Sequence, residues 1–366
     1  MARPRLRDLG ITIGELPTGP NNAITDVAGV AVGHTTLVRD EPRVARTGVT
    51  VVLPRTGEHA ADLCYGGLYS FNGNGEMTGS HWLEESGFVA GPIAITNTHQ
   101  VGVVRDALVE YELRTDQSGT WCLPIVAETY DGFLNDIGAF HVVSQDVFAA
   151  IDAASGGLVA EGNVGGGTGM ICHEFKGGIG TSSRVVDTGV GTFTVGVLVQ
   201  ANYGERRMLR LDGRPIGQIL DGEAVALPSD PAIKEGGSII IIVATDAPLL
   251  ADQCKRLARR ATVGLARVGG NGNNGSGDIF LAFSTANRVA PDHTEPFTVK
   301  TMPLERISPL FKATAEAVQE AIWNALCAAE TTTGYRGRTV QAIPHDRLAE
   351  TFHASHAGSS IVGEGD

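Results

Sequence analysis

One run of apolar residues constrains the fold of this chain more than any other feature of the sequence. The run is Ser238-Ile-Ile-Ile-Ile-Val-Ala244, the most hydrophobic strand in the protein, and it follows directly on Gly236-Gly237. An unbroken run of this kind is typical of a strand that is buried on both faces, whereas a half-exposed strand alternates apolar and polar residues. Strands rich in apolar residues are also expected at 48–53, 92–96, 123–127 and 192–200. The sequence therefore predicts sheets that are covered on each side by helices or by another sheet.

Four helices are expected among these strands, over residues 105–113, 144–154, 248–268 and 308–328. The third is expected to begin with Asp246 in a capping position and Pro248 in its first turn, and to end before Gly269. Its basic residues are interpreted as a solvated face: Lys255, Arg256, Arg259 and Arg260. Helices and strands alternate along the chain, and we find no internal repeat.

Composition and charge argue against several classes of protein. The chain has 28 Lys and Arg against 41 Asp and Glu, a net charge of −13, and nucleic-acid binding needs clustered cations instead. No stretch of 18 apolar residues is present to span a membrane, and residues 1–10 lack the apolar segment of a signal peptide. The five cysteines lie far apart and form no Cys-x-x-Cys pair, which predicts a reducing, cytoplasmic location and no cysteine-bound zinc.

Glycine is unusually frequent, at 48 of 366 residues, and two glycine-rich loops resemble nucleotide-binding motifs. Gly270-x-Gly272-x-x-Gly275 matches the dinucleotide pattern, but a helix is predicted before it and a strand, 278–283, after it. This is the reverse of the order that the motif requires. The loop Gly165–Gly169 lacks the Gly-Lys-Ser/Thr ending of a phosphate-binding loop, and is interpreted as a place of close backbone approach. Neither loop predicts a nucleotide site.

The chain has no G-x-S-x-G elbow and no H-E-x-x-H spacing, and its isolated histidines are interpreted as structural. A serine that a backbone cut leaves at a new N-terminus needs neither motif. Its own α-amine, with a reference pKa of about 7.7–8.0, can accept the hydroxyl proton. Such a cut calls for a glycine before the serine and a rigid strand after it. Gly237-Ser238 and Gly275-Ser276 both meet these conditions, and spacing alone does not choose between them.

Five segments of the chain resemble the family of L-aminopeptidase/D-esterases and β-peptidyl aminopeptidases, self-processing hydrolases with an N-terminal serine. The segments are NAITDVAGVAVGH (22–34), ETYDGFLN (128–135), VQANYG (199–204), the strand and turn of 238–250, and GSGD (275–278). They extend over nearly the whole chain. Together they are specific, whereas any one of them alone would be a weak signal.

The resemblance implies which serine is the nucleophile. In the family, the nucleophilic serine opens a buried strand, and a second serine with an acidic residue two positions later lies about forty residues downstream. Ser238 fits this role, since Ser276 and Asp278 follow it by 38 and 40 residues. The resemblance therefore implies self-cleavage between Gly237 and Ser238, with Ser276 and Asp278 as the supporting pair. Well-known members carry glutamate at the position of Asp278.

Three further residues are assigned through the same resemblance. Asn202 matches the asparagine whose amide stabilises the oxyanion of the tetrahedral intermediate. Glu128 and Tyr130 match the substrate pocket, where the carboxylate would pair with the free ammonium of the substrate and the phenol would hydrogen-bond the reacting centre. Without the resemblance, a buried asparagine and an ion-paired surface glutamate would be the simpler interpretations.

The resemblance implies an α+β fold, an αββα four-layer sandwich like that of N-terminal nucleophile hydrolases, in one self-processing domain (1–366). The predicted products are two fragments, 1–237 and 238–366, that stay together as a serine aminopeptidase without a metal or organic cofactor. A homotetramer or larger homo-oligomer is expected in the cytoplasm. Its substrates would be peptides or amino-acid amides and esters, with no membrane or nucleic-acid partner.

Two other functions remain open. An acyltransferase of the ornithine acetyltransferase type has a related self-cleaving architecture, but that group uses a threonine nucleophile, which Ser238 does not match. A non-catalytic protein with the same fold would remain a single chain. The substrate is open as well: its N-terminal residue can be an L-, D- or β-amino acid, because the pocket depends on loops such as 73–80 and 162–180.

Overall fold

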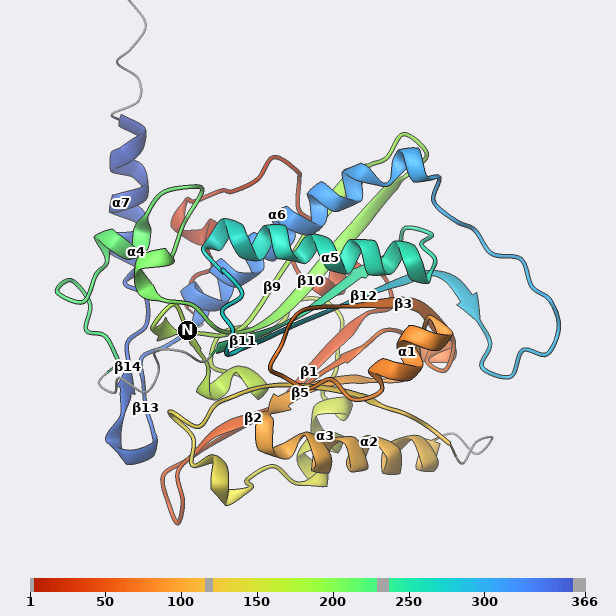
Figure 1. The fold of residues 1–366 in the computed structure, drawn as a ribbon, viewed down its shortest axis with the longest axis horizontal. Coiled ribbons are helices and arrows are strands. Elements are labelled where there is room, and N and C mark those ends of the chain that lie inside the picture. The colour runs from red at the N-terminus through yellow and green to blue at the C-terminus, as the bar shows by residue number, and fades with distance from the viewer. Residues whose placement is uncertain (1–2, 116–120, 229–236, 358–366) are drawn as a thin grey trace, which may run out of the picture.

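Two β-sheets lie face to face in the computed structural model, which describes residues 3–115, 121–228 and 237–357 (Figure 1). The larger sheet has the order β4 (Phe88–Val89), β3 (Leu63–Gly73), β12 (Ser276–Val289), β11 (Gly237–Thr245), β10 (Thr192–Asn202) and β9 (Gly178–Asp187). The smaller sheet has the order β1 (Ala31–Arg39), β2 (Ala45–Leu53), β5 (Ile93–Asn97) and β6 (Ile125–Thr129).

Helices cover the outer face of each sheet (Figure 1). The larger sheet is covered by α5 (Ala251–Val268) and α6 (Ser308–Ala328), and the smaller sheet by α2 (Val101–Thr115) and α3 (Ser144–Asp152). Shorter elements are α1 (Ser80–Ser86), α4 (Ile216–Ile219), α7 (His345–Ala357), and the hairpins β7 (Ile171–Cys172) with β8 (Phe175–Lys176) and β13 (Thr332–Thr333) with β14 (Thr339–Val340). Among the described residues, no helix is long and apolar enough to cross a membrane. The predicted αββα sandwich is confirmed.

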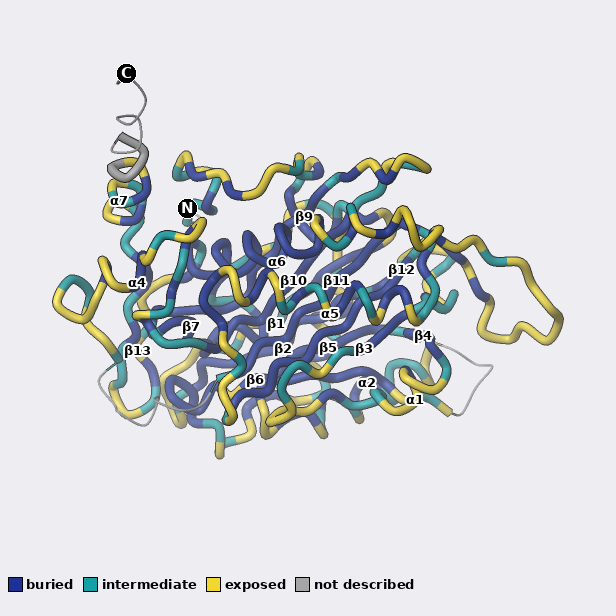
Figure 2. The backbone as a smooth tube through the Cα atoms, turned by 45° about the horizontal axis from the view of Figure 1, so that its top comes forward, coloured by how far each residue is buried: buried dark blue, intermediate teal, exposed yellow. Residues whose placement is uncertain are grey.

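Strand β11 shows how one strand serves two cores. Ile239 and Ile241 pack among the residues of α5 and α6, while Ile240 and Ile242 pack between the two sheets. Successive side chains of a strand point to opposite faces, so the unbroken apolar run is the consequence of burial on both sides. Figure 2 shows the inner strands buried along most of their length. The same alternation places Ser238 on the face toward the smaller sheet.

The sequence does not predict three of the long strands, β1, β3 and β9. In β3 and β9, glycines stand where a helix packs directly on the strand backbone. A Cβ on Gly67 would collide with the backbone of Lys255 in α5, and one on Gly180 with the carbonyl of Ala321 in α6. Glycine has a low β-propensity, so the same residues that allow this close packing weaken the strand pattern in the sequence. The loop Gly165–Gly169 is buried as well, which confirms its interpretation as a segment of close backbone approach.

The predicted start of α5 is wrong, whereas the bounds of α6 are confirmed. α5 begins at Ala251, and the side chain of Gln253 accepts a hydrogen bond from the backbone of Leu250 at 3.2 Å. Asp246 is not the cap, because its carboxylate accepts from the backbone N–H of Thr194 at 2.7 Å and so ties β10 to the end of β11. The glycine-rich loop after α5 leads into β12, the order that excludes a dinucleotide motif.

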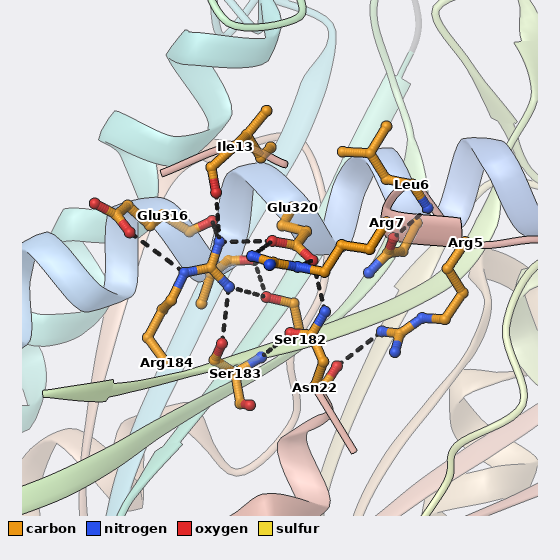
Figure 3. A network of polar contacts seen from close by, with 12 residues as sticks. Arg5, Leu6, Arg7, Ile13, Asn22, Ser182, Ser183, Arg184, Glu316 and Glu320 are labelled. Atoms are coloured by element: carbon orange, nitrogen blue, oxygen red, sulfur yellow. Dashed lines mark hydrogen bonds and ion pairs between the residues drawn. The ribbon is translucent and has the colours of Figure 1, made fainter. Parts of the chain in front are cut away.

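A buried ion-pair network ties the N-terminal segment to α6 and β9 (Figure 3). The fully buried carboxylate of Glu320 pairs with Arg7 (Nε–Oε1 2.6 Å) and with Arg184 (Nη2–Oε2 2.6 Å). Asn22 donates to the same carboxylate at 2.5 Å, and Glu316 pairs with Arg184 at 3.3 Å. Burial by itself would raise the pKa of Glu320, but the hydrogen bond from Arg7 and the charges of Arg184 and Arg7 outweigh it and lower the pKa. The network thus joins early parts of the chain to a helix that follows β11.

Candidate active site

Ser238 lies at the start of β11, at the centre of the larger sheet. The residue is only 7% exposed, and its Oγ accepts a hydrogen bond from the backbone N–H of Gly277 at 3.2 Å. Gly277 is its register partner on the parallel strand β12, and Asn202 is its partner on the antiparallel strand β10. A Cβ on Gly237 would lie 2.9 Å from the Cα of Tyr203, so the position before Ser238 has no room for a side chain. The residues 229–236 lie outside the described part of the chain.

Asn202 is held in one orientation beside Ser238. Its Oδ1 accepts from the backbone N–H of Ile171 at 2.8 Å, and its Nδ2 donates to the carbonyl of Tyr130 at 3.0 Å. The two bonds settle which end of the amide is oxygen and which is nitrogen. An amide nitrogen carries two hydrogens, and Tyr130 uses one of them. The other is available to an acceptor on the face that Asn202 shares with Ser238, as the stabiliser of an oxyanion requires.

Ser276 and Asp278 form a pair on the opposite face of the sheet from Ser238. Ser276 Oγ donates to Asp278 Oδ1 at 2.7 Å, and the alternation of β12 turns both side chains toward α5 and α6. They reach Ser238 through the backbone: Gly277 donates to its Oγ, and the N–H of Ile239 bonds the carboxylate of Asp278. Burial raises the pKa of Asp278, and the hydrogen bonds from Ser276 and from the backbone of Ile239 oppose this shift.

Glu128 projects from β6 of the smaller sheet and is almost fully buried. Its Oε1 accepts from the backbone N–H of Glu76 at 3.0 Å, and its Oε2 accepts from the hydroxyl of Thr98. Burial raises the pKa of Glu128, because a charged carboxylate loses its hydration, and the two hydrogen bonds partly oppose this shift. No ion pair of Glu128 is found within the described residues. The carboxylate is therefore held by two hydrogen bonds and forms no ion pair with a described residue, although the charge of His99 is near enough to lower its pKa.

Glu128 and Ser238 are brought together by two glycines that lie between them. A Cβ on Gly75 would lie 3.2 Å from Glu128 Oε1 and 3.1 Å from the Cα of Gly277. Gly277 in turn donates to Ser238 Oγ. Residues that are 110 positions apart in the sequence, on different sheets, thus face the same small region.

Tyr130 takes a different place from the other predicted residues. Its carbonyl accepts a hydrogen bond from Asn202, but the residue is 53% exposed and its phenol lies against Gly132. The structure thus pairs Ser238 with Asn202 across two strands, connects Glu128 to them through Gly75 and Gly277, and connects Tyr130 through its backbone.

Several residues of the site were not predicted individually. They act mainly through backbone groups or through the absence of a side chain: Gly75, the N–H of Glu76, the N–H of Gly277, and the N–H of Ile171, together with the hydroxyl of Thr98. Backbone donors leave no mark on residue type, and the one available signal was the loop 73–80, expected to shape the pocket. Within the part of the chain that the structure describes, no group of three or more His, Cys, Asp or Glu could hold a metal ion.

Comparison with known proteins agrees with this geometry. A model of peptidase family S58 matches residues 22–340. The chain belongs to peptidase family S58. Among the relatives of this S58 chain, beta-peptidyl aminopeptidase BapA of Sphingosinicella microcystinivorans is 50% identical over 361 residues, which cover 94% of this chain and 91% of the relative.

Two solved structures are similar to the S58 chain. A beta-aminopeptidase of Burkholderia sp. has a TM-score of 0.89 and 51% identity, covering 96% of this chain and 98% of its own. The L-aminopeptidase D-ala-esterase/amidase of Ochrobactrum anthropi has a TM-score of 0.88 and 45% identity, covering 96% and 99%. The latter is described as a prototype for the serine aminopeptidases and as a variant of the Ntn hydrolase fold. The S58 chain has the N-terminal nucleophile hydrolase fold and is a serine-type aminopeptidase.

Proposed function

We propose that this S58 peptidase cuts its own chain between Gly237 and Ser238, and that Ser238 then hydrolyses amide or ester bonds next to a free N-terminal amine. The observation that carries the proposal is the position of Ser238. It is buried at the start of a central strand, after a glycine, with a backbone N–H on its oxygen and Asn202 across the strand pair. The cut would expose the α-amine of Ser238 as the base, so no histidine is needed.

Each neighbour has a role in the proposed reaction. Asn202, with its amide orientation fixed, would donate to the oxyanion. Ser276 and Asp278 would hydrogen-bond the α-amine that the cut exposes on Ser238. The backbone N–H groups of Gly277 and Ile239 already link this pair to Ser238. The carbonyl of Tyr130 would keep the amide of Asn202 oriented, and a hydrogen bond from its phenol to the reacting centre stays a prediction from the resemblance. The fragments 1–237 and 238–366 would stay together because β11 is buried between β10 and β12.

The proposed substrate has a free ammonium because Glu128 is a buried carboxylate that forms no ion pair with a described residue. Relatives that are 50% and 43% identical carry the name beta-peptidyl aminopeptidase, which favours β-amino acids among the accepted N-termini. The names of these relatives give less support to an acyltransferase of the ornithine acetyltransferase type. The cytoplasmic location and the homo-oligomer expected from the sequence stay predictions.

The test uses purified wild-type protein and pairs of p-nitroanilides with a free or an acetylated N-terminus. We expect two bands on a denaturing gel and turnover of the free amines only, since acetylation removes the charge that Glu128 would bind. A single band near 38.3 kDa would contradict the processing claim. Equal turnover of the free and acetylated substrates would contradict the role of Glu128.

The pKa of Glu128 predicts how binding depends on pH. Burial raises this pKa above the ordinary value of about 4.3 for glutamate. The carboxylate is charged above the raised pKa and neutral below it, so affinity for an ammonium is lost as the pH falls through that value. The measurement is the inhibition constant of an amino alcohol, which has the ammonium but no scissile bond, across acidic pH. The Glu128→Gln variant should bind it weakly at every pH, and a wild-type midpoint at or below the ordinary glutamate value would contradict the prediction.

A further inference from the structure

Residues 72–78, which we call the bridging segment, connect the two sheets beside Ser238. The segment leaves the larger sheet at the end of β3 and joins the smaller sheet at Met77, which forms an isolated bridge with Ala127 of β6. Thr78 continues the contact by donating from its backbone to the carbonyl of Val126 at 2.9 Å. Ser238 lies on the first of these sheets and Glu128 on the second. The bridging segment is therefore a direct covalent link between the sheet of the nucleophile and the sheet of the carboxylate.

Hydrogen bonds hold the bridging segment to both sheets, through two residues that are only two positions apart. Asn74 donates from its backbone to the carbonyl of Ser276 at 3.1 Å and from its side chain to the carbonyl of Gly275 at 2.8 Å. Glu76 donates from its backbone to Glu128 Oε1 at 3.0 Å. One end is thus tied to the loop that leads to Gly277 and the other to the carboxylate itself.

Gly75 lies between these two hydrogen-bonded residues, in a space that has no room for a side chain. Its missing Cβ would lie 3.1 Å from Gly277 Cα and 3.2 Å from Glu128 Oε1, tighter than an ordinary van der Waals contact. Its φ is outside the left-handed region, so an alanine could adopt its backbone conformation. The absence of a side chain at Gly75 is required by space rather than by backbone conformation.

We infer that Gly75 is a specificity-determining residue, because the thickness of the bridging segment sets the distance between Glu128 and Ser238. The inference rests on the proposed function. With the ammonium on Glu128 and the carbonyl at Ser238, that distance selects the number of carbons between the two groups. An α-amino acid has one carbon there and a β-amino acid has two, a difference of about one C–C bond or roughly 1.5 Å. Since a misplacement of about 1 Å can change a rate roughly 10²-fold, a small change in thickness alters the preference.

The test is Gly75→Ala, assayed with β-alanine p-nitroanilide and L-alanine p-nitroanilide. The two substrates are isomers with the same leaving group, so losses of active enzyme cancel in the ratio of their kcat/KM values. The added methyl group is expected to push Glu128 and Gly277 apart by a few tenths of an ångström, and the ratio of the β- to the α-substrate is expected to rise several-fold. The matched control is Gly73→Ala in the same segment, whose Cβ would meet nothing within 4 Å and which should keep the wild-type ratio.

The outcomes separate the inference from the function on which it rests. No turnover of either substrate by the wild type would count against the proposed function. Turnover by Gly75→Ala with an unchanged or lowered ratio would overturn the inference alone. If Gly75→Ala is not cleaved into fragments, Asn74→Ala decides, since it releases the bond to Gly275 without adding bulk. A loosened bridging segment should move the ratio toward one, and a wild-type ratio in that variant would overturn the inference.

Discussion

Replacing Ser238 by alanine is expected to leave one polypeptide of 38.3 kDa on a denaturing gel, where the wild type gives two. The wild-type fragments would hold 237 and the remaining 129 of the 366 residues, roughly 25 and 13.5 kDa in proportion to the whole chain. Alanine has no hydroxyl with which to attack the carbonyl of Gly237. Aminopeptidase turnover should fall to background as well, because the nucleophile and the α-amine that the cut exposes are lost together.

The matched control is Ser276→Ala. Ser276 bonds Asp278 at 2.7 Å but lies on the opposite face of the sheet from Ser238, so its loss should slow the cut without abolishing it. If Ser238→Ala still gives the two wild-type bands, Ser238 is not the nucleophile of the cut. If Ser276→Ala at the same time gives a single band, Ser276 is the nucleophile instead. Circular dichroism of both variants checks the fold, since Ser238→Ala also removes the acceptor of the Gly277 N–H.

Replacing Glu320 by alanine is expected to lower the free energy of unfolding by about 3–5 kcal/mol, the range for breaking a buried ion pair. Glu320 is fully buried and receives Arg7, Arg184 and Asn22 (Figure 3). Without it, the guanidinium of Arg184 stays fully buried with the more distant Glu316, at 3.3 Å, as its carboxylate partner. Chemical denaturation in the Ser238→Ala background measures the change, because a single uncut chain then unfolds.

Lys312→Ala is the control for Glu320→Ala. Lys312 lies on the same helix and also pairs with the N-terminal segment, through the exposed Glu15, while its second carboxylate partner, the buried Glu316, is 3.9 Å away. Exposed pairs contribute little to stability, so its midpoint should stay close to that of the parent. Equal midpoints for the two variants would contradict a stabilising role of the buried network. In the processed protein, Arg184 and Glu320 would belong to different fragments, and the network would then resist their separation.

The residues of the candidate site could be chosen from the sequence because they lie in segments that resemble a known family. Ser238, Asn202 and Glu128 each lie on a strand, within a sequence segment that resembles the family. The structure places all three in one region. The expectation that Asp246 caps α5 was wrong, because its carboxylate is used by a neighbouring strand that no local pattern reveals. The same limit applies to Ser276 and Asp278. Their spacing was recognised, but the face of the sheet that they occupy follows from strand register.

By itself, the sequence determined the features that depend on local pattern. The unbroken apolar run of β11 required burial on both faces, and helix α6 was bounded correctly by its apolar stripe. The tertiary structure alone decided how Glu128 meets Ser238, because that distance depends on a segment that crosses between two sheets and on a glycine with no space for a methyl group. Hydrophobic periodicity records which face of an element is buried, but not which other element covers it.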